Sequence, residues 1–223
     1  MPQASLIDIQ HLTWHYPDGT QLIFDNFSLQ VHSGDFCFLV GKSGAGKTTL
    51  VKFLIRQLTP PTKTIFFNKE DIARFTSNEV QGYRSRIGVV FQDFKLIDRM
   101  TVWENITYPL KLHRQDPKQE EAYLHHLMEL LNLTHRKDAY PAQLSWWERQ
   151  RVAIARSLVL HPKFVIADEP TWNIDDEAAR VIADTFIKLH QEENTILFIT
   201  HDHNLQEYIG EQTKTRQVSI DML

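Results

Sequence analysis

A glycine-rich segment in the first quarter of the chain carries the residue types that hold phosphate groups. It reads Gly41-Lys-Ser-Gly-Ala-Gly-Lys-Thr-Thr49, follows an apolar stretch at 36–40 and precedes a helical pattern at 47–58. Glycines at this spacing let backbone N–H groups point at phosphate oxygens, and the helix N-terminus adds positive potential. Lys47 would place its charge beside the β- and γ-phosphates, and the Thr48 hydroxyl is a ligand for Mg²⁺. The predicted phosphate-binding residues are Gly41, Ser43, Gly44, Ala45, Gly46, Lys47, Thr48 and Thr49.

Two carboxylates follow a second apolar stretch and suit the same chemistry. Residues 164–167 are apolar and lead directly into Asp168 and Glu169. A carboxylate at a strand end can hold Mg²⁺ through water, and a carboxylate one residue further on can reach the water that attacks the γ-phosphate. The alternative is a strand that merely ends in solvated acids, which a preceding phosphate loop makes the weaker interpretation. We therefore expect Asp168 at the metal and Glu169 as the catalytic base.

The elements that must position these groups alternate between apolar strands and amphipathic helices. Strands are expected at 5–9, 22–31, 36–40, 64–67, 87–91, 164–167, 195–200 and 217–220, and helices at 47–58, 118–131, 148–160 and 178–190. Several strands are nearly continuous in Val, Ile, Leu and Phe, which predicts a mostly parallel sheet buried on both faces. The first two strands alternate around a turn signal at 17–20, which predicts an antiparallel hairpin. No strand pattern occurs at 93–160, which indicates a helical insert in an α/β protein.

The composition excludes several classes of protein. The chain has 223 residues, of which 42% are hydrophobic and 23% charged, so it can bury one sizeable core and is not disordered. Its net charge of −4 gives no overall attraction for nucleic acid, and its apolar runs are too short to span a bilayer. The single cysteine, Cys37, cannot form an internal disulfide and is expected in the core. Glycine is scarce, with 8 residues, about half the usual share of roughly 7%.

Six motifs in the same order make the chain resemble the ATP-binding-cassette (ABC) ATPases, the nucleotide-binding subunits of transporters and their relatives. The resemblance covers nearly the whole chain. The loop at 41–49 corresponds to the family's Walker A motif, and 164–168 followed by Glu169 corresponds to Walker B with the catalytic glutamate. The segment 144–151 corresponds to the signature motif that begins Leu-Ser.

The resemblance implies roles for five further residues. Tyr16 would stack on adenine, Gln92 would approach Mg²⁺ and signal to a membrane partner, and His201 would contact the γ-phosphate. Ser145 of the signature and Asp175 of the D-loop would act across a homodimer in which two subunits sandwich two ATP molecules. The expected catalytic residues are thus Glu169, His201 and Gln92, and the expected metal-binding residues are Thr48, Gln92 and Asp168.

The same resemblance implies an organisation and a cellular setting. The expected fold is an α/β P-loop NTPase with a mostly parallel core sheet, an antiparallel β subdomain and an inserted helical subdomain. Residues 1–223 would form one domain, with 1–92 and 161–223 as the nucleotide-binding core and 93–160 as the helical subdomain. ATP and Mg²⁺ would be bound, and a separate transmembrane subunit would couple to the ATP-driven dimer. No nucleic acid is expected, and the protein would lie in the cytoplasm, peripheral on the inner face of the plasma membrane.

Within the family, the segment 91–106 resembles the cell-division subfamily, FtsE. Members of that subfamily pair with the membrane protein FtsX to control cell-wall hydrolases. The segment 168–175 is similar to FtsE and also to the ATPases of lipoprotein and macrolide exporters. The resemblance therefore implies an ATP-hydrolysing subunit that works with an FtsX-like partner in cell division, with an exporter ATPase as the alternative.

Tryptophan stands at three positions where the family has glycine. The signature has Trp146 and Trp147 between Ser145 and Glu148, and the D-loop region has Trp172. Glycine lets the signature backbone approach the partner's γ-phosphate, whereas an indole adds about 150–250 Å² of side-chain surface. One hypothesis is that the gene uses UGA for glycine and was translated as if UGA meant tryptophan. The alternative is a degenerate signature in a nucleotide-gated structural module that binds ATP without hydrolysing it.

The chain contains 11 histidines, which raises the alternative of a histidine-based metal site. Adjacent residues such as His125 and His126 do not share a helix face, so we expect them to be solvated. His203 is expected at the surface. The resemblance accounts for His201 through the γ-phosphate, and no metal site of histidines is expected.

Overall fold

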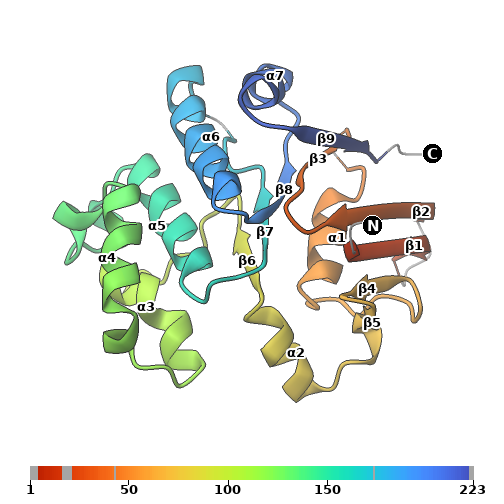
Figure 1. The fold of residues 1–223 in the computed structure, drawn as a ribbon, viewed down its shortest axis with the longest axis horizontal. Coiled ribbons are helices and arrows are strands. Elements are labelled where there is room, and N and C mark those ends of the chain that lie inside the picture. The colour runs from red at the N-terminus through yellow and green to blue at the C-terminus, as the bar shows by residue number, and fades with distance from the viewer. Residues whose placement is uncertain (1–4, 17–21, 43, 173, 221–223) are drawn as a thin grey trace.

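The computed structural model describes residues 5–16, 22–42, 44–172 and 174–220, which form two sheets with helices around them (Figure 1). Five parallel strands, in the order β6-β7-β8-β3-β9, form one sheet. Four antiparallel strands, in the order β2-β1-β4-β5, form the other. The strands are β1 (Ser5–His15), β2 (Leu22–His32), β3 (Phe36–Val40), β4 (Ile65–Phe67), β5 (Glu70–Asp71), β6 (Ile87–Val90), β7 (Phe164–Asp168), β8 (Thr195–Ile199) and β9 (Thr215–Ser219). The predicted α/β class, parallel core sheet and antiparallel first hairpin are confirmed.

In the described part of the chain, seven α-helices connect these strands. They are α1 (Lys47–Leu54), α2 (Ser77–Arg84), α3 (Val102–Leu112), α4 (Glu121–Leu130), α5 (Trp146–Leu158), α6 (Asp176–Gln191) and α7 (His203–Gln212). Four short 3-10 turns are η1 (Ile72–Arg74), η2 (Pro117–Glu120), η3 (Thr134–Arg136) and η4 (Pro141–Gln143). In the described residues, no helix is long and apolar enough to cross a membrane.

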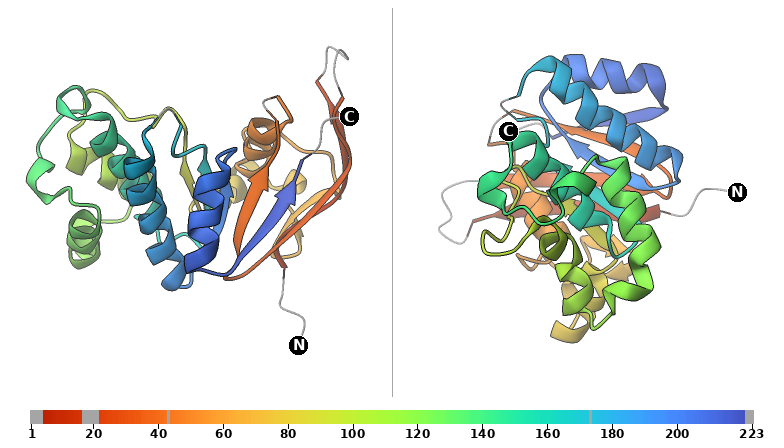
Figure 2. Two further views of the ribbon diagram at one scale, coloured as in Figure 1. Left: turned by 90° about the horizontal axis from the view of Figure 1, so that it is seen from above. Right: turned by 90° about the vertical axis from the view of Figure 1, so that its left-hand side faces the viewer.

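Strand β3 explains why the parallel sheet is apolar on both faces. Successive side chains of a strand point to opposite faces. Phe36 and Phe38 therefore join the core formed with α3 to α7, while Cys37 and Leu39 join the core formed with α1 and the antiparallel sheet. Burial raises the pKa of the Cys37 thiol to about 11, so this thiol is an inert part of the core. The parallel sheet therefore lies between two hydrophobic cores, and each core packs on one of its faces (Figure 2).

The helices α3, α4 and α5 lie together on one side of the molecule, away from the antiparallel sheet (Figures 1 and 2). Arg156 of α5 donates hydrogen bonds to the carbonyl oxygens of Phe94 and Lys95, in the segment that follows β6. A Cβ on Gly88 would lie only 2.5 Å from the carbonyl oxygen of Ser157, so α5 packs directly on β6. The helical group is therefore joined to the parallel sheet mainly through α5.

Most of the expected strands and helices are found, with shifted ends. The strand expected at 5–9 extends to His15 because β1 accommodates several register shifts against β2. The helix expected at 47–58 ends at Leu54, and the one expected from 118 begins with the 3-10 turn η2. The last strand covers Thr215–Ser219 in place of the expected 217–220.

Three helices and one short strand were not expected from the sequence. Two of these helices, α2 and α3, begin in capping boxes, Thr76 with Glu79 and Thr101 with Glu104, which were available as sequence signals. Within α3, Pro109 obscures the helical pattern. The other two, α7 and β5, lack strong apolar periodicity, and tertiary packing decides their conformation.

Candidate nucleotide-binding site

Four parallel strands end around one cavity of about 740 Å³. The loop after β3, the segment after β6, the end of β7 and the segment after β8 all contribute to it. Loops at the carboxyl ends of parallel strands commonly form ligand sites. The cavity is lined by Tyr16, Ile23, Gly41, Lys42, Gly44, Gly46, Lys47, Thr48, Thr49, Gln92, Asp168, Glu169, Trp172 and His201. The structure therefore brings the glycine-rich loop, the two carboxylates, Gln92, His201 and Tyr16 into one place.

The glycine-rich loop turns from β3 into α1 through left-handed backbone. Gly44 has φ of 83° and Gly46, which caps α1, has φ of 91°. A Cβ on Gly46 would also meet the side chain of Ile23 at 2.6 Å, so no other residue fits without movement. Ala45 is buried beneath the loop and does not line the cavity. Ser43, which the sequence also placed at the phosphates, lies outside the described residues.

The ammonium of Lys47 lies at the centre of this loop. Its Nζ donates hydrogen bonds to the carbonyl oxygens of Gly41 at 2.6 Å and Lys42 at 3.1 Å. It also lies 4.0 Å from Oε1 of Glu169, and both side chains are nearly buried. A buried ammonium beside backbone N–H groups at a helix N-terminus is an arrangement that binds a phosphate chain.

The two carboxylates at the end of β7 occupy different environments. Burial and, to a smaller extent, the charge of Glu169 raise the pKa of Asp168 to about 6, although the charge of Lys47 opposes the shift. Glu169 has a φ of 47°, a left-handed conformation that is unusual for a residue other than glycine. Such strain concentrates at functional sites, and here it turns the Glu169 side chain toward the cavity. His201 Nδ1 lies 2.9 Å from Glu169 Oε2, so a protonated Nδ1 donates a hydrogen bond to this carboxylate.

The donor set fits a bound Mg²⁺. The carboxylate of Asp168 is 8% exposed and sits beside the carboxylate of Glu169. One ammonium, Lys47, faces both of these acids. A hard divalent cation with oxygen ligands would relieve this excess of negative charge. The Thr48 hydroxyl and the Gln92 amide line the same cavity and could complete an oxygen-rich site.

Tyr16 also lines the cavity. Its hydroxyl is hydrogen-bonded to the Thr49 hydroxyl at 3.0 Å, and its ring packs edge-on against Trp14 with centroids 4.5 Å apart. The aromatic ring is therefore held at the rim, near Ile23 of β2. Sequence reasoning missed Ile23 and Lys42 as lining residues, because nothing in their types or spacing distinguishes them from ordinary strand and loop positions.

Besides Ala45, two further expected site residues do not line the cavity. Ser145 caps α5, where its hydroxyl accepts a hydrogen bond from the Glu148 N–H, and Asp175 caps α6 by accepting from the Ala178 N–H. Burial acts to raise the pKa of Glu148, but hydrogen bonds from Ser145 and Arg136 outweigh it, and the pKa lies below its ordinary value. Neither Ser145 nor Asp175 lines the cavity of its own chain.

Comparison with known proteins now identifies the family. The family model described as "ABC transporter" matches residues 24–172. The chain belongs to the ABC transporter family. The chain is therefore an ABC ATPase, an enzyme that hydrolyses ATP and uses Mg²⁺.

Curated relatives fall into more than one group. The cell division ATP-binding protein FtsE of Bacillus subtilis is 36% identical over 90% of this chain and 87% of its own length. The methionine import ATP-binding protein MetN 1 of Enterococcus faecalis is also 36% identical, over 88% of this chain and 56% of its own length. Among solved structures, the dimeric ATP-binding cassette MJ0796, bound to ADP and Pi in a post-hydrolysis state, is 26% identical. It has a TM-score of 0.82 over 97% of this chain and 96% of the other.

The three tryptophans that stand where the family has glycine, Trp146, Trp147 and Trp172, occupy two separate places in this ABC ATPase. The indole of Trp146 packs edge-on against Phe94, with centroids 4.9 Å apart, and against Trp147 at 5.2 Å. Trp172 is 49% exposed at the mouth of the nucleotide cavity, 5.5 Å from the ring of His201. None of the three has a positive φ, so glycine is not required there for backbone conformation. Any effect of these residues must come from the bulk of the indoles.

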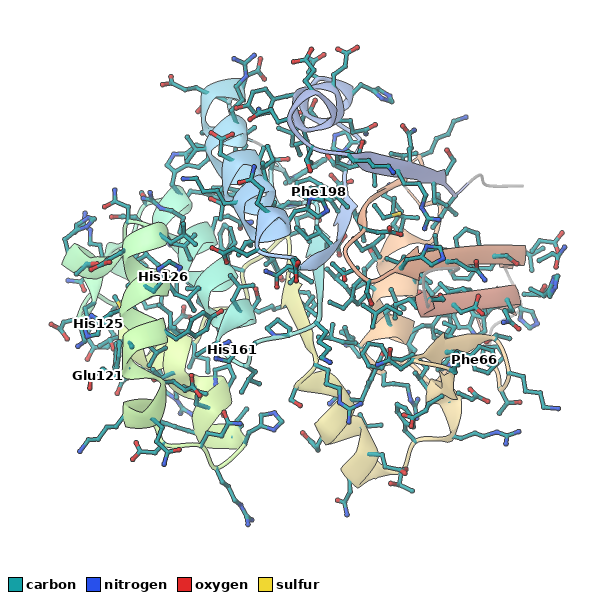
Figure 3. The ribbon with its side chains drawn as sticks, in the orientation of Figure 1. Phe66, Glu121, His125, His126, His161 and Phe198 are labelled. Atoms are coloured by element: carbon teal, nitrogen blue, oxygen red, sulfur yellow. The ribbon has the colours of Figure 1, made fainter. Side chains whose placement is uncertain are left out.

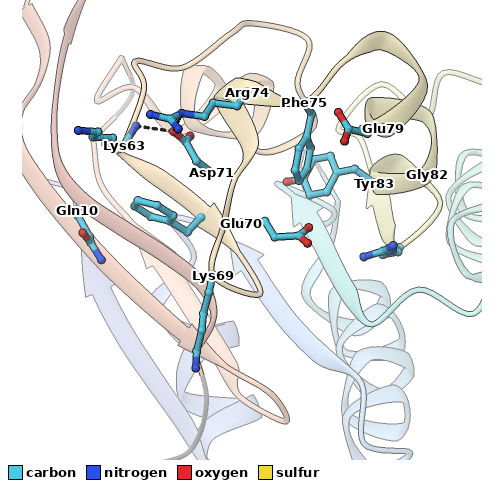
Figure 4. Close-up of a pocket in the computed structure, with 12 residues that line it drawn as sticks. Gln10, Lys63, Lys69, Glu70, Asp71, Arg74, Phe75, Glu79, Gly82 and Tyr83 are labelled. Atoms are coloured by element: carbon cyan, nitrogen blue, oxygen red, sulfur yellow. Dashed lines mark hydrogen bonds and ion pairs between the residues drawn. The ribbon is translucent and has the colours of Figure 1, made fainter.

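A second and larger hollow, of about 930 Å³, lies between β4, β5 and α2 (Figure 4). Its acidic side chains already serve local structure, because Asp71 accepts hydrogen bonds from the N–H groups of Lys63 and Ala73. Glu79 closes the capping box of α2 with Thr76. This hollow has no glycine-rich loop, and we do not assign it to the nucleotide.

The histidines on the helical side do not converge on a metal. His125 pairs with Glu121 at 3.9 Å and His126 with Glu192 at 4.0 Å, so neighbours along α4 face different partners (Figure 3). His161 instead stacks on Tyr123. No group of three or more potential metal ligands of the His, Cys, Asp and Glu types occurs among the described residues.

Asp168 makes the stability of the nucleotide-free protein depend on pH. The folded protein holds the Asp168 proton up to about pH 6, whereas the unfolded carboxyl loses it near 3.8, so stability falls as pH rises between these values. We expect Asp168→Asn to gain stability relative to wild type across this window, by up to about 3 kcal/mol at neutral pH. Denaturant unfolding on either side of the folded pKa measures the difference. A difference that does not change with pH contradicts the assigned environment.

The intact mass of the protein from its native host decides between the two explanations of the tryptophans. If UGA encodes glycine in that host, the mass will be lower than the printed sequence by three tryptophan-to-glycine differences, and tandem fragmentation will place glycine at 146, 147 and 172. A mass that matches all 5 tryptophans rules out recoding. In that case the degenerate signature is real.

Proposed function

We propose that this chain is the ATP-hydrolysing subunit of an FtsE-like membrane complex that acts in cell division. The single observation that carries the proposal is the convergence of Lys47, Asp168, Glu169 and His201 around one cavity. Support for the cell-division role comes from the FtsE relatives and from the segment 91–106, which resembles that subfamily. The MetN relatives favour an importer ATPase as the second candidate, and the sequence of 168–175 keeps lipoprotein and macrolide exporters as alternatives.

Each cavity residue has a role in hydrolysis that its position supports. Tyr16 would hold the adenine, and the loop with Lys47 would hold the phosphates once Nζ exchanges its two carbonyl partners for phosphate oxygens. A bound Mg²⁺, held by Thr48, Gln92 and Asp168, would neutralise developing charge on the phosphates. Glu169 would orient and deprotonate the attacking water, and His201 would fix the Glu169 carboxylate and contact the γ-phosphate.

We propose that two copies of the chain complete each other's sites. Ser145 and Asp175 lie outside the cavity of their own chain and sit at helix N-termini, where they could meet the nucleotide of a second copy. The MJ0796 cassette, which shares this fold, is described as a dimer. Closure around ATP and opening after hydrolysis would then be the movement passed to a partner.

An apolar groove beside the segment after β6 suits a membrane partner. The groove, of about 510 Å³, lies between residues 55–57, α2, β6 and the ends of α3 and α5. Tyr108, Pro109 and Leu112 supply apolar surface, and Leu112 is 63% exposed. Arg84 and Arg156 line it, and no carboxylate is among the described residues of its lining. We therefore propose that it receives an apolar segment with acidic side chains from a separate transmembrane subunit, FtsX-like, which would hold the chain at the inner face of the plasma membrane.

We propose a single ATPase domain over 1–223, in which 93–160 forms the helical subdomain that carries this groove. The core made of 1–92 and 161–223 would bind the nucleotide. The segment that follows Gln92 connects the two parts, and Arg156 anchors it to α5. A change at Gln92 would therefore be transmitted to the groove.

The tryptophans favour a second candidate function, a nucleotide-gated module that does not hydrolyse ATP. Trp146 and Trp147 adjoin Ser145 on the surface that would face the second copy. Two adjacent indoles there would hold the two copies apart. This module would still bind ATP, because the cavity of each chain is complete without its signature segment.

ATPase assays of two forms of the purified chain separate these functions. One form carries the printed tryptophans, and the other carries glycine at 146, 147 and 172. We expect the glycine form to hydrolyse Mg²⁺-ATP at least about tenfold faster, since about 1.4 kcal/mol of steric cost at the interface gives that factor. Glu169→Gln in the glycine form should abolish turnover and is the control. Equal rates for the two forms contradict the steric role of the indoles, and no hydrolysis by either contradicts the ATPase proposal.

Photo-crosslinking in membranes of the native host tests the groove. A photoreactive residue at Leu112 should give a product with a polytopic membrane protein, while the same residue at Val181 on α6, which is 51% exposed, is the matched control. A partner with a large extracytoplasmic loop supports the FtsX-like assignment. Crosslinking to a lipoprotein-release permease would instead assign the chain to the exporter ATPases. Equal labelling from both positions contradicts the proposal that the groove binds the membrane partner.

A further inference from the structure

Gln150 is a buried amide without a hydrogen bond. Its residue is 0% exposed, and neither its Oε1 nor its Nε2 has a partner within the described part of the chain. Asn105, an equally buried amide on α3, shows the usual situation. Its Oδ1 accepts from the Ile97 N–H, and its Nδ2 donates to carbonyl oxygens that include those of Ile97 and Met100. Burying an amide with no partner costs free energy, so we expect Gln150 to find a hydrogen-bond partner in another state of the protein.

The position of Gln150 on α5 places it opposite the segment that carries Gln92. Trp146, four residues earlier, contacts Phe94, and Ser157, seven residues later, lies against Gly88. Residues four and seven apart share a helix face, so Gln150 is on the face turned to β6 and the residues after it. At about 1.5 Å of rise per residue, Gln150 lies about 6 Å along the axis from Trp146.

The level of Gln150 along α5 corresponds to the segment that ends at Phe94. The face of α5 between Trp146 and Ser157 spans the chain from Phe94 back to Gly88. Gln150 lies between Trp146 and Arg156, which both contact Phe94, and this places it beside the segment 91–94. Those residues follow the last residue of β6, Val90, and are free of the sheet hydrogen bonds that hold β6 to β7. Gln92 itself lines the nucleotide cavity.

We propose that Gln150 is a positioning residue for Gln92. When Gln92 turns toward the metal, the carboxamide of Gln150 hydrogen-bonds the backbone of residues 91–92 and holds the segment in that position. Without nucleotide the bond is absent, and the unpaired amide raises the free energy of the resting state. This inference rests on the proposed ATPase function. It adds that α5 positions Gln92 of its own chain.

The test compares Gln150→Met with wild type in the full chain. Methionine keeps the volume and removes the polar atoms, so we expect the nucleotide-free variant to unfold at a higher temperature. Asn105→Leu should unfold at a lower temperature, and Gln119→Met at an exposed position should not change. If Gln150→Met lowers the unfolding temperature or prevents folding, Gln150 has a partner in the resting state, and the proposal is wrong.

The second measurement is the Mg²⁺ dependence of ATP binding. Gln150→Met should leave ATP affinity without Mg²⁺ unchanged, and it should raise the Mg²⁺ concentration for half-maximal enhancement by about fivefold to tenfold, the factor that one hydrogen bond supplies. In a Gln92→Ala background the same substitution should have no further effect on the Mg²⁺ requirement. An unchanged Mg²⁺ requirement, or a shift that persists without Gln92, overturns the proposal. Failure of wild type to bind Mg²⁺-ATP would instead overturn the proposed function.

Discussion

The site depends on an unequal pairing of charges between Lys47 and the carboxylates of Asp168 and Glu169. One ammonium faces two acids, and burial leaves Asp168 with a pKa of about 6. This pairing leaves both signs of charge poorly satisfied, because the ammonium is held partly by loop carbonyl oxygens and the charged form of Asp168 is disfavoured by burial. A bound phosphate chain would pair with the Lys47 ammonium, and a divalent cation would pair with the two carboxylates.

The rest of the fold serves to keep these groups in place. Lys47 begins α1 after the loop that follows β3, and the two acids lie at the end of β7, so their separation is set by the order of strands in the parallel sheet. That sheet is packed on both faces, which leaves its strands little freedom to shift. The segments after β6 and β8 that line the cavity lie outside the sheet and are not held by its packing on both faces. Movement on binding nucleotide is therefore expected in Gln92 and His201 more than in the loop or the acids.

The sequence was sufficient to predict the fold class and most of the cavity, because both depend on local patterns. The glycine spacing of 41–49 and the apolar run into Asp168 each predict a strand that is followed by functional residues. In a parallel sheet the carboxyl ends of the strands lie at the same edge, so these residues come together. Ile23 and the unpaired amide of Gln150 could not be predicted, since each depends on which distant residue packs against it. Helix α3 was missed because Pro109 interrupts its helical pattern. The left-handed backbone of Glu169 likewise comes from the tertiary structure rather than from its residue type.

The central claim is that the loop at 41–49 binds Mg²⁺-ATP through the ammonium of Lys47. Isothermal titration calorimetry of the purified chain with Mg²⁺-ATP, for wild type and for Lys47→Ala, tests it most directly. We predict saturable binding of one nucleotide per chain by wild type and a loss of at least about tenfold in affinity for the variant, since a charge-assisted contact to phosphate is worth about 1.5–3 kcal/mol. No heat of binding with wild type, or equal affinity for the two proteins, would contradict the account.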